Sequence, residues 1–230
     1  MMSEGLKGIF KTIVSLFPEP QFTRPRNLKV FDWTNQNAPG KRVLNLGSGI
    51  GQFDHYLSKE VKPINLDISS SKKNLHVIAD AHQLPFKKDS IDIVYSIAVL
   101  EHTQKPWVVT DEIFRVLPSG GYVVLELPFL NVIHDEDDYF RFTDKGIRSL
   151  FDSKRFEVVF EQVGSGGGSF LSVFLLEYFQ QFVPSRYLKI FWRLTMRYFT
   201  CLFKYLDMAI DSSKSLRITA NSFSFIGRKR

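Results

Sequence analysis

The sequence predicts an α/β protein built on a seven-stranded, mostly parallel sheet with helices on both faces. Three observations lead to this prediction. Short apolar runs recur along the chain, as expected of strands that are covered on both faces. The first run leads directly into a glycine-rich turn, and the next runs end in polar residues. A hydrophobic segment with helical spacing separates the last two runs, so a helical insertion is predicted there.

The predicted elements follow from these runs and from the turn residues between them. Strands are predicted at 43–46, 61–66, 75–79, 91–95, 122–127, 156–163 and 222–227. Helices are predicted at 6–17, 52–59, 107–116, 144–151 and 185–211, with an apolar segment at 170–183 and irregular structure at 21–40. The domain organisation is therefore a lead-in with an amphipathic helix (1–40), a core (41–163 and 212–230) and a hydrophobic insertion (164–211).

The glycine-rich turn follows the first predicted strand, and in it Gly47, Gly49 and Gly51 alternate with other residues. Glycine adopts positive φ without strain and lets a ligand lie directly on the main chain. A dinucleotide-binding fingerprint would need glycine at position 52, where this chain has Gln. The turn therefore predicts a cofactor cradle of another kind, with an ordinary strand-to-helix turn as the alternative.

Carboxylates follow the second and third predicted strands. Asp67 lies at the distance from the glycines at which a βαβ unit ends its second strand, where a carboxylate can accept hydrogen bonds from both ribose hydroxyls. Asp80 ends the third strand. Because the carboxyl ends of parallel strands meet at one edge of the sheet, and ligands bind there, we expect both residues to lie beside the glycine turn.

Between residues 41 and 128 the chain resembles the class I S-adenosylmethionine-dependent methyltransferases, in their small-molecule, type 11-like branch. The motifs that carry the resemblance are VLNLGSGIG, NLDIS, ADAHQLPF, DSIDIVYSIAVLEH and EIFRVLPSGGYVVLELP. The resemblance implies a Rossmann-like fold and S-adenosylmethionine as the cofactor. The family usually has an acidic residue where this chain has Asn45; an amide accepts a hydrogen bond but cannot pair electrostatically with the ammonium of the cofactor.

The resemblance also implies which residues bind the cofactor. The glycine turn is expected to hold the methionine part, Asp67 the ribose, and Asp80 with Ala81 the adenine. Asp80 could instead serve only as a cap at the end of its strand. The full predicted set is Asn45, Gly47, Ser48, Gly49, Gly51, Asp67, Ile68, Asp80, Ala81 and Ser96.

Three residues are predicted on the acceptor side. His102 follows the fourth strand, in a stretch that flanks the cofactor in the resembled family, and is either a base or a structural residue. The loop HDEDDYFRFT at 134–143 resembles one found in methyltransferases of surface-polysaccharide biosynthesis. In it, His134 could accept a hydroxyl proton and Arg141 could hold an anionic group. The alternative is structural: Thr143 caps the next helix and Arg141 pairs with a nearby carboxylate.

His134 and the carboxylates of its loop could form a metal site, but no supporting ligand spacing is found elsewhere in the sequence, so no metal is predicted.

The second helix of the insertion carries polar side chains at spacings of three and four, and nearly all of its remaining circumference is apolar. The polar set is Arg186, Lys189, Arg193, Arg197, Thr200, Lys204, Asp207 and Asp211. We expect such a helix to be covered on two sides. The cover could be a membrane surface or a lipid-linked substrate through 169–210, a second subunit of a homodimer, or the protein's own core. Neither segment of the insertion is expected to cross a bilayer.

Composition limits the remaining possibilities. A chain of 230 residues suffices for one well-buried domain with an embellishment. The single cysteine, Cys201, excludes an intramolecular disulfide and suits a reducing compartment. No signal peptide is evident, so a cytoplasmic protein is expected, with peripheral membrane contact as a possibility. The formal charge of +6 permits attraction to nucleic acid, anionic lipid or acidic substrates.

We therefore expect a methyltransferase that acts on a small acceptor, with a sugar hydroxyl of a glycan or of its lipid-linked precursor as the favoured group. No nucleic-acid partner is expected, because aromatic residues interrupt the basic residues of the long helix and no asparagine-proline-proline-aromatic motif follows the fourth strand. Two alternative functions remain: a non-catalytic cofactor-binding or membrane-associated protein of the same fold, and an RNA methyltransferase.

Overall fold

The computed structural model describes residues 24–49, 51, 53–69, 75–209 and 217–230. The chain divides into two compact units. The core unit comprises Arg24–Phe129, Ile133–Gly164 and Ser222–Arg230, and the helical unit includes Leu130–Val132 and Ser165–Asn221. The amphipathic helix predicted at 6–17 lies outside the described residues.

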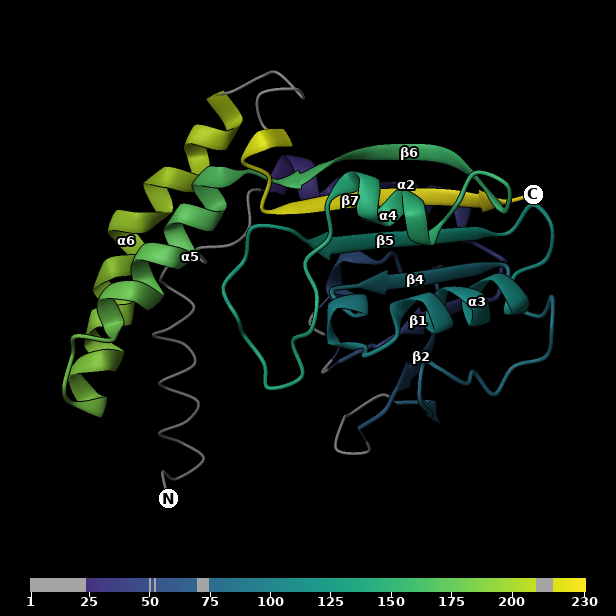
Figure 1. The fold of residues 1–230 in the computed structure, drawn as a ribbon, viewed down its shortest axis with the longest axis horizontal. Coiled ribbons are helices and arrows are strands. Elements are labelled where there is room, and N and C mark those ends of the chain that lie inside the picture. The colour runs from purple at the N-terminus through teal and green to yellow at the C-terminus, as the bar shows by residue number, and fades with distance from the viewer. Residues whose placement is uncertain (1–23, 50, 52, 70–74, 210–216) are drawn as a thin grey trace. The chain divides into compact units, whose positions relative to one another are not determined.

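The core unit is organised around one sheet of seven strands (Figure 1). The strands are β1 (Val43–Leu46), β2 (Ile64–Asp67), β3 (Val77–Ile78), β4 (Ile93–Ile97), β5 (Tyr122–Pro128), β6 (Phe156–Ser165) and β7 (Ser222–Lys229). Their order across the sheet is β3-β2-β1-β4-β5-β7-β6. The pairs from β3 to β5 are parallel, whereas β7 runs antiparallel to β5. The predicted fold class is thereby confirmed.

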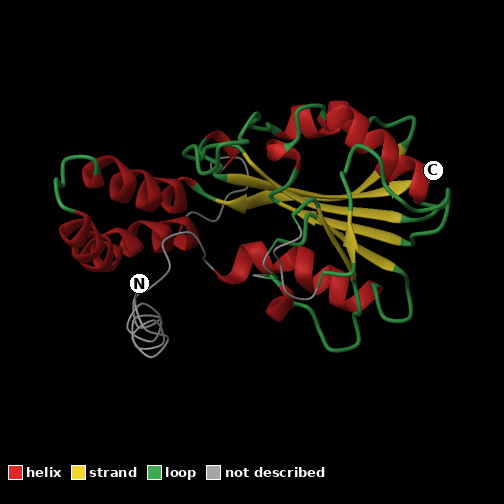
Figure 2. Ribbon diagram, turned by 90° about the horizontal axis from the view of Figure 1, so that it is seen from below, coloured by secondary structure: helices red, strands yellow, loops and turns green. Residues whose placement is uncertain are grey.

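Helices cover both faces of this sheet (Figures 1 and 2). On one face lie α3 (Pro106–Val116) and α4 (Asp144–Leu150), both close to their predicted bounds. Buried residues recur along α3 at the helical spacing, at Val109, Ile113 and Val116. The proline at the start of α3 lacks only a backbone N–H that the first turn leaves unbonded in any case.

The opposite face is covered by α2 (Arg24–Asn37), and here the prediction of irregular structure at 21–40 is wrong. Val30 and Thr34 are buried at a spacing of four residues, which places them on one face of the helix, and Ala38 is buried directly after it. Phe31 is also buried and packs on Tyr95 of β4. Pro25 is compatible with this helix because it lies in the first turn.

The helix predicted at 52–59 is reduced to η1, a single 3-10 turn at Asp54–Tyr56. The side chain of Asn35 on α2 explains why the helix does not continue. Its amide nitrogen donates to the Tyr56 carbonyl oxygen at 2.9 Å, and its oxygen accepts from the Ser58 amide at 2.8 Å. These bonds satisfy backbone groups that a longer helix would have paired within itself.

The helical unit consists mainly of two helices that lie side by side, α5 (Gly167–Gln180) and α6 (Arg186–Ala209) (Figures 1 and 2). Both correspond to predicted segments, with α5 beginning three residues earlier than expected. Among the residues that the structure describes, no helix is both long and apolar enough to cross a membrane.

Candidate active site at the carboxyl ends of the parallel strands

A cavity of about 780 Å³ lies beside the carboxyl ends of β1 to β4. Its walls include Leu46 at the end of β1, Gly47 directly after it, Asp67 at the end of β2, Asp80 after β3, and Ile97 at the end of β4. The chain order reverses between β1 and β4, since β2 and β3 lie on one side and β5 on the other. Open α/β sheets bind their ligands at such a switch point.

The glycine turn forms one wall of this cavity. Gly47, Gly49 and Gly51 have φ values of 66°, 57° and 75°, which favour glycine. A Cβ atom on Gly47 would lie 2.5 Å from a methyl group of Val99, so the chain passes too close to Val99 for any side chain. The turn thus exposes backbone to the cavity at Gly47 and Gly49, as predicted for a cradle.

Asp67 joins this turn to the second strand. It is 6% exposed, and its carboxylate accepts hydrogen bonds from the Gly49 amide at 2.9 Å and the Ser69 amide at 3.0 Å. A carboxylate offers about four acceptor positions, so it can brace the turn and still accept bonds from a ligand. Asp67 lines the cavity, as the ribose-binding prediction requires.

Asp80 lies on the cavity wall beyond the third strand. It accepts hydrogen bonds from the His82 amide at 2.8 Å and approaches the His82 ring at 2.6 Å. The bond from the His82 amide is the main reason why the pKa of Asp80 lies below its usual value. Asp80 is therefore an ionised acceptor at neutral pH, and Ala81 and Ile68 line the same cavity.

Four members of the predicted cofactor set, Asn45, Ser48, Gly51 and Ser96, are not among the cavity-lining residues. Asn45 is buried and donates to the side-chain oxygen of Asn65 at 3.1 Å, across the neighbouring strand. The amide of Ser48 donates to the Leu66 carbonyl oxygen at 3.0 Å, and Ser96 is fully buried in β4.

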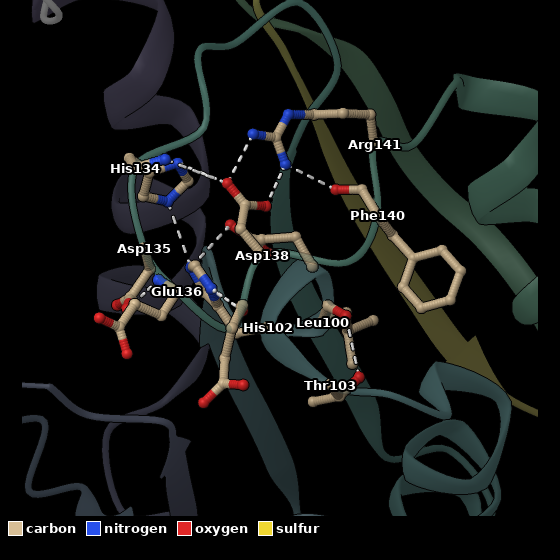
Figure 3. A network of polar contacts seen from close by, with 11 residues as sticks. Leu100, His102, Thr103, His134, Asp135, Glu136, Asp138, Phe140 and Arg141 are labelled. Carbon is tan, nitrogen blue, oxygen red and sulfur yellow. Dashed lines mark hydrogen bonds and ion pairs between the residues drawn. The ribbon is translucent and has the colours of Figure 1, made fainter.

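The acceptor-side residues meet beside the cavity. His102 lies on the short turn η2 (Leu100–His102) after β4 and lines the cavity. The loop that contains His134 is tied to this turn, because the amides of Tyr139 and Phe140 both donate to the Glu101 carbonyl oxygen. Figure 3 shows the result: the imidazoles of His102 and His134 point toward one another, with their Nε2 atoms 3.2 Å apart.

Arg141 is engaged by Asp138, and both nitrogen ends of its guanidinium contact that carboxylate (Figure 3). These bonds lower the pKa of Asp138 to about 2. Thr143 caps α4 by accepting a hydrogen bond from the Gly146 amide at 3.0 Å. The pairing of Arg141 with Asp138 and the capping of α4 by Thr143 are the two features of the structural alternative that the sequence left open. Neither His134 nor Arg141 is among the cavity-lining residues.

Sequence reasoning assigned no role to Glu101. Its side chain is fully buried, and neither carboxylate oxygen accepts a hydrogen bond from the described residues. Burial raises the pKa of Glu101 to about 8. The sequence did contain a signal: a glutamate lies directly before His102 in an otherwise apolar stretch. Burying its charged side chain there without a polar partner would cost free energy. Glu101 is not among the cavity-lining residues; the unpredicted polar residues on the wall are His82, Thr103, Gln104, Lys105, Asp135, Asp137 and Tyr139.

The residues of the cavity fit S-adenosylmethionine. The volume is within the range of small-molecule sites. The two carboxylates can accept bonds from hydroxyl and amino groups, and the glycine turn allows a ligand to approach its backbone closely. Val99, Ile97 and Val108 supply apolar wall for an adenine ring and an aliphatic chain.

In its fold and over the segment that forms most of the cavity, the chain is similar to Rossmann-like, S-adenosylmethionine-dependent methyltransferase domains. The family described as "Methyltransferase domain" matches residues 44–125, the segment that contributes most of the cavity wall. The cofactor that the sequence predicted is the one that this family supports.

Curated methyltransferases are similar to part of the chain. A malonyl-(acyl-carrier protein) O-methyltransferase from a Marinomonas species is 38% identical in an alignment of 97 positions, which covers 36% of this chain and 36% of that protein. An uncharacterized methyltransferase from Mycolicibacterium vanbaalenii is 31% identical in an alignment of 104 positions, which covers 40% of this chain and 41% of the relative. The chain thus covers little more than a third of the length of these relatives.

Solved structures resemble the fold over most of the chain. A putative sarcosine dimethylglycine methyltransferase from Galdieria sulphuraria superimposes with a TM-score of 0.58 at 13% identity, covering 98% of both chains. The cyclase SpnF has a TM-score of 0.57 at 16% identity, covering 89% of this chain and 80% of its own. SpnF is named as a cyclase, so proteins of this fold also carry out reactions other than methyl transfer. The fold therefore does not identify the acceptor, which depends on the residues of the site.

Proposed function

We propose that the protein transfers the methyl group of S-adenosylmethionine to a hydroxyl of a small, sugar-like acceptor. S-adenosylmethionine supplies a methyl group on a sulfonium, which is already a good electrophile. The protein's task is then chiefly to hold the two reactants in position. In this proposal Gly47 and Gly49 approach the methionine part, Asp67 binds the ribose, and Asp80 with Ala81 binds the adenine.

The observation that carries the acceptor class is the polarity of one cavity wall. Beyond His102, this wall is formed by Gln104, Lys105, Asp135, Asp137 and Tyr139. These side chains can donate and accept hydrogen bonds with a hydroxyl-rich molecule, and Gln104, Tyr139 and Asp137 are already linked to one another through the Tyr139 hydroxyl. An aliphatic acceptor would form no hydrogen bonds with this wall. A sugar of a glycan or of a lipid-linked precursor matches this wall.

His102 is the proposed base, because it alone of the three predicted acceptor-side residues lines the cavity. Its Nδ1 lies 2.7 Å from the Asp137 carbonyl oxygen, which fixes the ring so that Nε2 is the atom available to a hydroxyl proton. His134 and Arg141 then act as positioning residues: Arg141 holds Asp138, which in turn contacts His134.

The test is methyl transfer from S-adenosylmethionine labelled in its methyl group. The acceptors are nucleotide sugars, polyprenyl-phosphate sugars, a malonyl thioester and RNA, with a polyprenyl phosphate that carries no sugar as the matched control. We expect an alkali-stable methyl ether on a sugar and no label on the control. Label on the thioester or on RNA would contradict the acceptor class, and cofactor binding without transfer to any acceptor would favour a non-catalytic binding protein.

We further propose that α5 and α6 contact a membrane surface, which suits a lipid-linked acceptor. The support is an inverted distribution of side chains in the helical unit. Between the helices lie polar groups: the Asp207 carboxylate accepts from the amides of Gly168 and Ser169, and Arg193 pairs with Glu177 at 2.8 Å. Outward-facing apolar residues of α6 are strongly exposed, with Phe191 at 67%.

The contact between the two helices is also of the kind found in lipid. A Cβ atom on Gly168 would lie 2.0 Å from the Phe203 carbonyl oxygen, and the Ser172 hydroxyl donates to the Thr200 carbonyl oxygen. Small residues and hydroxyl bonds between helices are typical where the surroundings are apolar. Residues 165–221 carry seven Lys or Arg against three Asp or Glu, which favours an anionic headgroup layer.

Vesicle flotation tests this contact. The parent is expected to float with vesicles that contain anionic lipid and much less with purely zwitterionic ones. A triple change of Phe191, Phe199 and Leu202 to Ser should abolish flotation, because these side chains are 65–67% exposed on α6. Val159→Ser is the control, since it removes a 45%-exposed apolar residue from β6. Equal flotation of the triple variant and the parent would contradict the proposal. It would also be contradicted if the parent formed a stable dimer, the triple variant did not, and vesicles bound neither protein.

A further inference from the structure

Glu101, His102 and His134 converge at the edge of the cavity. Their ligand atoms, one from each side chain, all lie within 4.8 Å of one another. His102 Nε2 is 3.2 Å from His134 Nε2 and 3.8 Å from a carboxylate oxygen of Glu101. The three residues come from η2 and from the loop that follows β5, so the cluster exists only because the fold brings the two segments together.

The outer nitrogen of each histidine is held by an oxygen. His102 Nδ1 lies 2.7 Å from the Asp137 carbonyl oxygen, and His134 Nδ1 lies 3.2 Å from the Asp138 carboxylate. A carbonyl oxygen and an ionised carboxylate only accept hydrogen bonds, so each Nδ1 donates its proton. A neutral ring then has its lone pair on Nε2. Two lone pairs therefore face each other across 3.2 Å, an arrangement that a cation between them stabilises.

Glu101 points to the same cation. It is fully buried, and both of its oxygens lack a hydrogen-bond partner among the described residues. Its nearest oppositely charged candidate is the His102 ring at 3.8 Å, beyond hydrogen-bond reach. A buried carboxylate in this position is costly unless it is paired or coordinates a metal.

We propose that Glu101, His102 and His134 bind a divalent transition-metal ion, for which Zn²⁺ is the natural candidate. Two imidazoles and one carboxylate form a ligand set typical of catalytic zinc sites, and outer hydrogen bonds to carbonyl or carboxylate groups are usual for metal-binding histidines. Nitrogen atoms about 2.1 Å from one ion and separated as these are subtend about 100°, close to a tetrahedral angle. A rotation of the Glu101 carboxylate toward the two rings completes the set.

Three protein ligands leave at least one position of such an ion open. Because His102 lines the cavity, the open position is expected to face the acceptor side. The ion would occupy the His102 Nε2 lone pair, so in the metal-bound protein His102 would not act as the base. Instead, the ion would bind a hydroxyl oxygen of the acceptor and lower the pKa of that hydroxyl, so that its proton is released to solvent. This narrows the acceptor to molecules that present a hydroxyl next to the cofactor. This last step rests on the proposed methyl transfer, whereas metal binding itself does not.

The experiment is a Co²⁺ titration of the full chain, purified without a histidine tag and treated with a chelator, followed by visible absorption. We expect one equivalent to bind, with the strong bands of a four- or five-coordinate site. Glu101→Gln and His134→Ala should each weaken binding about 100-fold or more, and Zn²⁺ should displace Co²⁺. His55→Ala is the matched control, because it removes a histidine on η1, outside the cluster.

Circular dichroism establishes that each variant is folded, and calorimetry with S-adenosylmethionine separates this inference from the proposed function. The metal site would be overturned if the parent bound no Co²⁺, or if the variants bound Co²⁺ as tightly as the parent does. The short distance between the two imidazoles would then be explained by a proton that they share. Failure of the parent to bind S-adenosylmethionine contradicts the proposed function instead, whatever the outcome with Co²⁺.

Discussion

Replacing Asp67 by Ala is expected to weaken the binding of S-adenosylmethionine about 100-fold or more. Two hydrogen bonds between a carboxylate and ribose hydroxyls contribute roughly 3 kcal/mol or more together, since bonds to charged groups are stronger than neutral ones. Asp67 also accepts the Gly49 amide at 2.9 Å, so its loss loosens the turn that the cofactor is proposed to contact. Calorimetric titration of the purified variant measures the change.

The conservative variant and a control separate these two contributions. Asp67→Asn keeps a neutral acceptor for the Gly49 amide, and it should bind the cofactor with intermediate affinity. Asp111→Ala removes an exposed carboxylate that pairs with Arg155 on the surface, and it should bind as the parent does. If Asp67→Ala binds S-adenosylmethionine as tightly as the parent, the proposed cofactor site is misplaced.

Glu126→Gln is expected to stabilise the protein above neutral pH. Glu126 lies in β5, the Ser222 hydroxyl donates to its carboxylate at 2.9 Å, and burial raises its pKa from 4.5 to about 7. In the folded state it therefore retains a proton that the unfolded chain loses above about pH 4.5. The unfolded chain binds fewer protons over this interval, so the stability of the parent falls as the pH rises from about 4.5 to 7.

This loss amounts to roughly 3 kcal/mol once the pH exceeds the folded-state pKa. Glutamine has nearly the same shape and does not ionise, so the variant should unfold like the parent near pH 4 and at a higher temperature near pH 8.5. Thermal melts across this range measure the difference. Glu60→Gln, at an exposed position, should follow the parent throughout. A variant whose melting temperature changes with pH just as the parent's does would show that Glu126 does not titrate in this interval.

Much of the fold could be predicted because its signals are local. The strands of the core were predicted from short apolar runs. The turn after β1 was recognisable from its alternating glycines, whose positive φ other residues adopt only with strain. Asp67 and Asp80 could be predicted as neighbours because parallel strands bring their carboxyl ends to one edge. Both indeed line one cavity.

The failures occurred where a tertiary contact competes with a local pattern. A helix was predicted directly after the glycine turn, yet Asn35 binds the backbone there at Tyr56 and Ser58, and only a single turn forms. Conversely, α2 forms in a polar stretch because the sheet buries Val30 and Phe31. The spacing of polar residues on α6 was visible in the sequence. The burial of Thr200 and Asp207, two of these residues, could not be predicted from it.

The sequence by itself determined the sheet, the glycine cradle and the two carboxylates beside it, since each depends on residues close together in the chain or on the rule that aligns parallel strands. Only the tertiary structure decided which side chains meet on the acceptor side. Glu101 and His102 lie more than 30 positions before His134, and no periodicity relates them. Their approach depends on the loop after β5 folding back onto η2, where the Tyr139 amide donates to the Glu101 carbonyl oxygen at 2.8 Å.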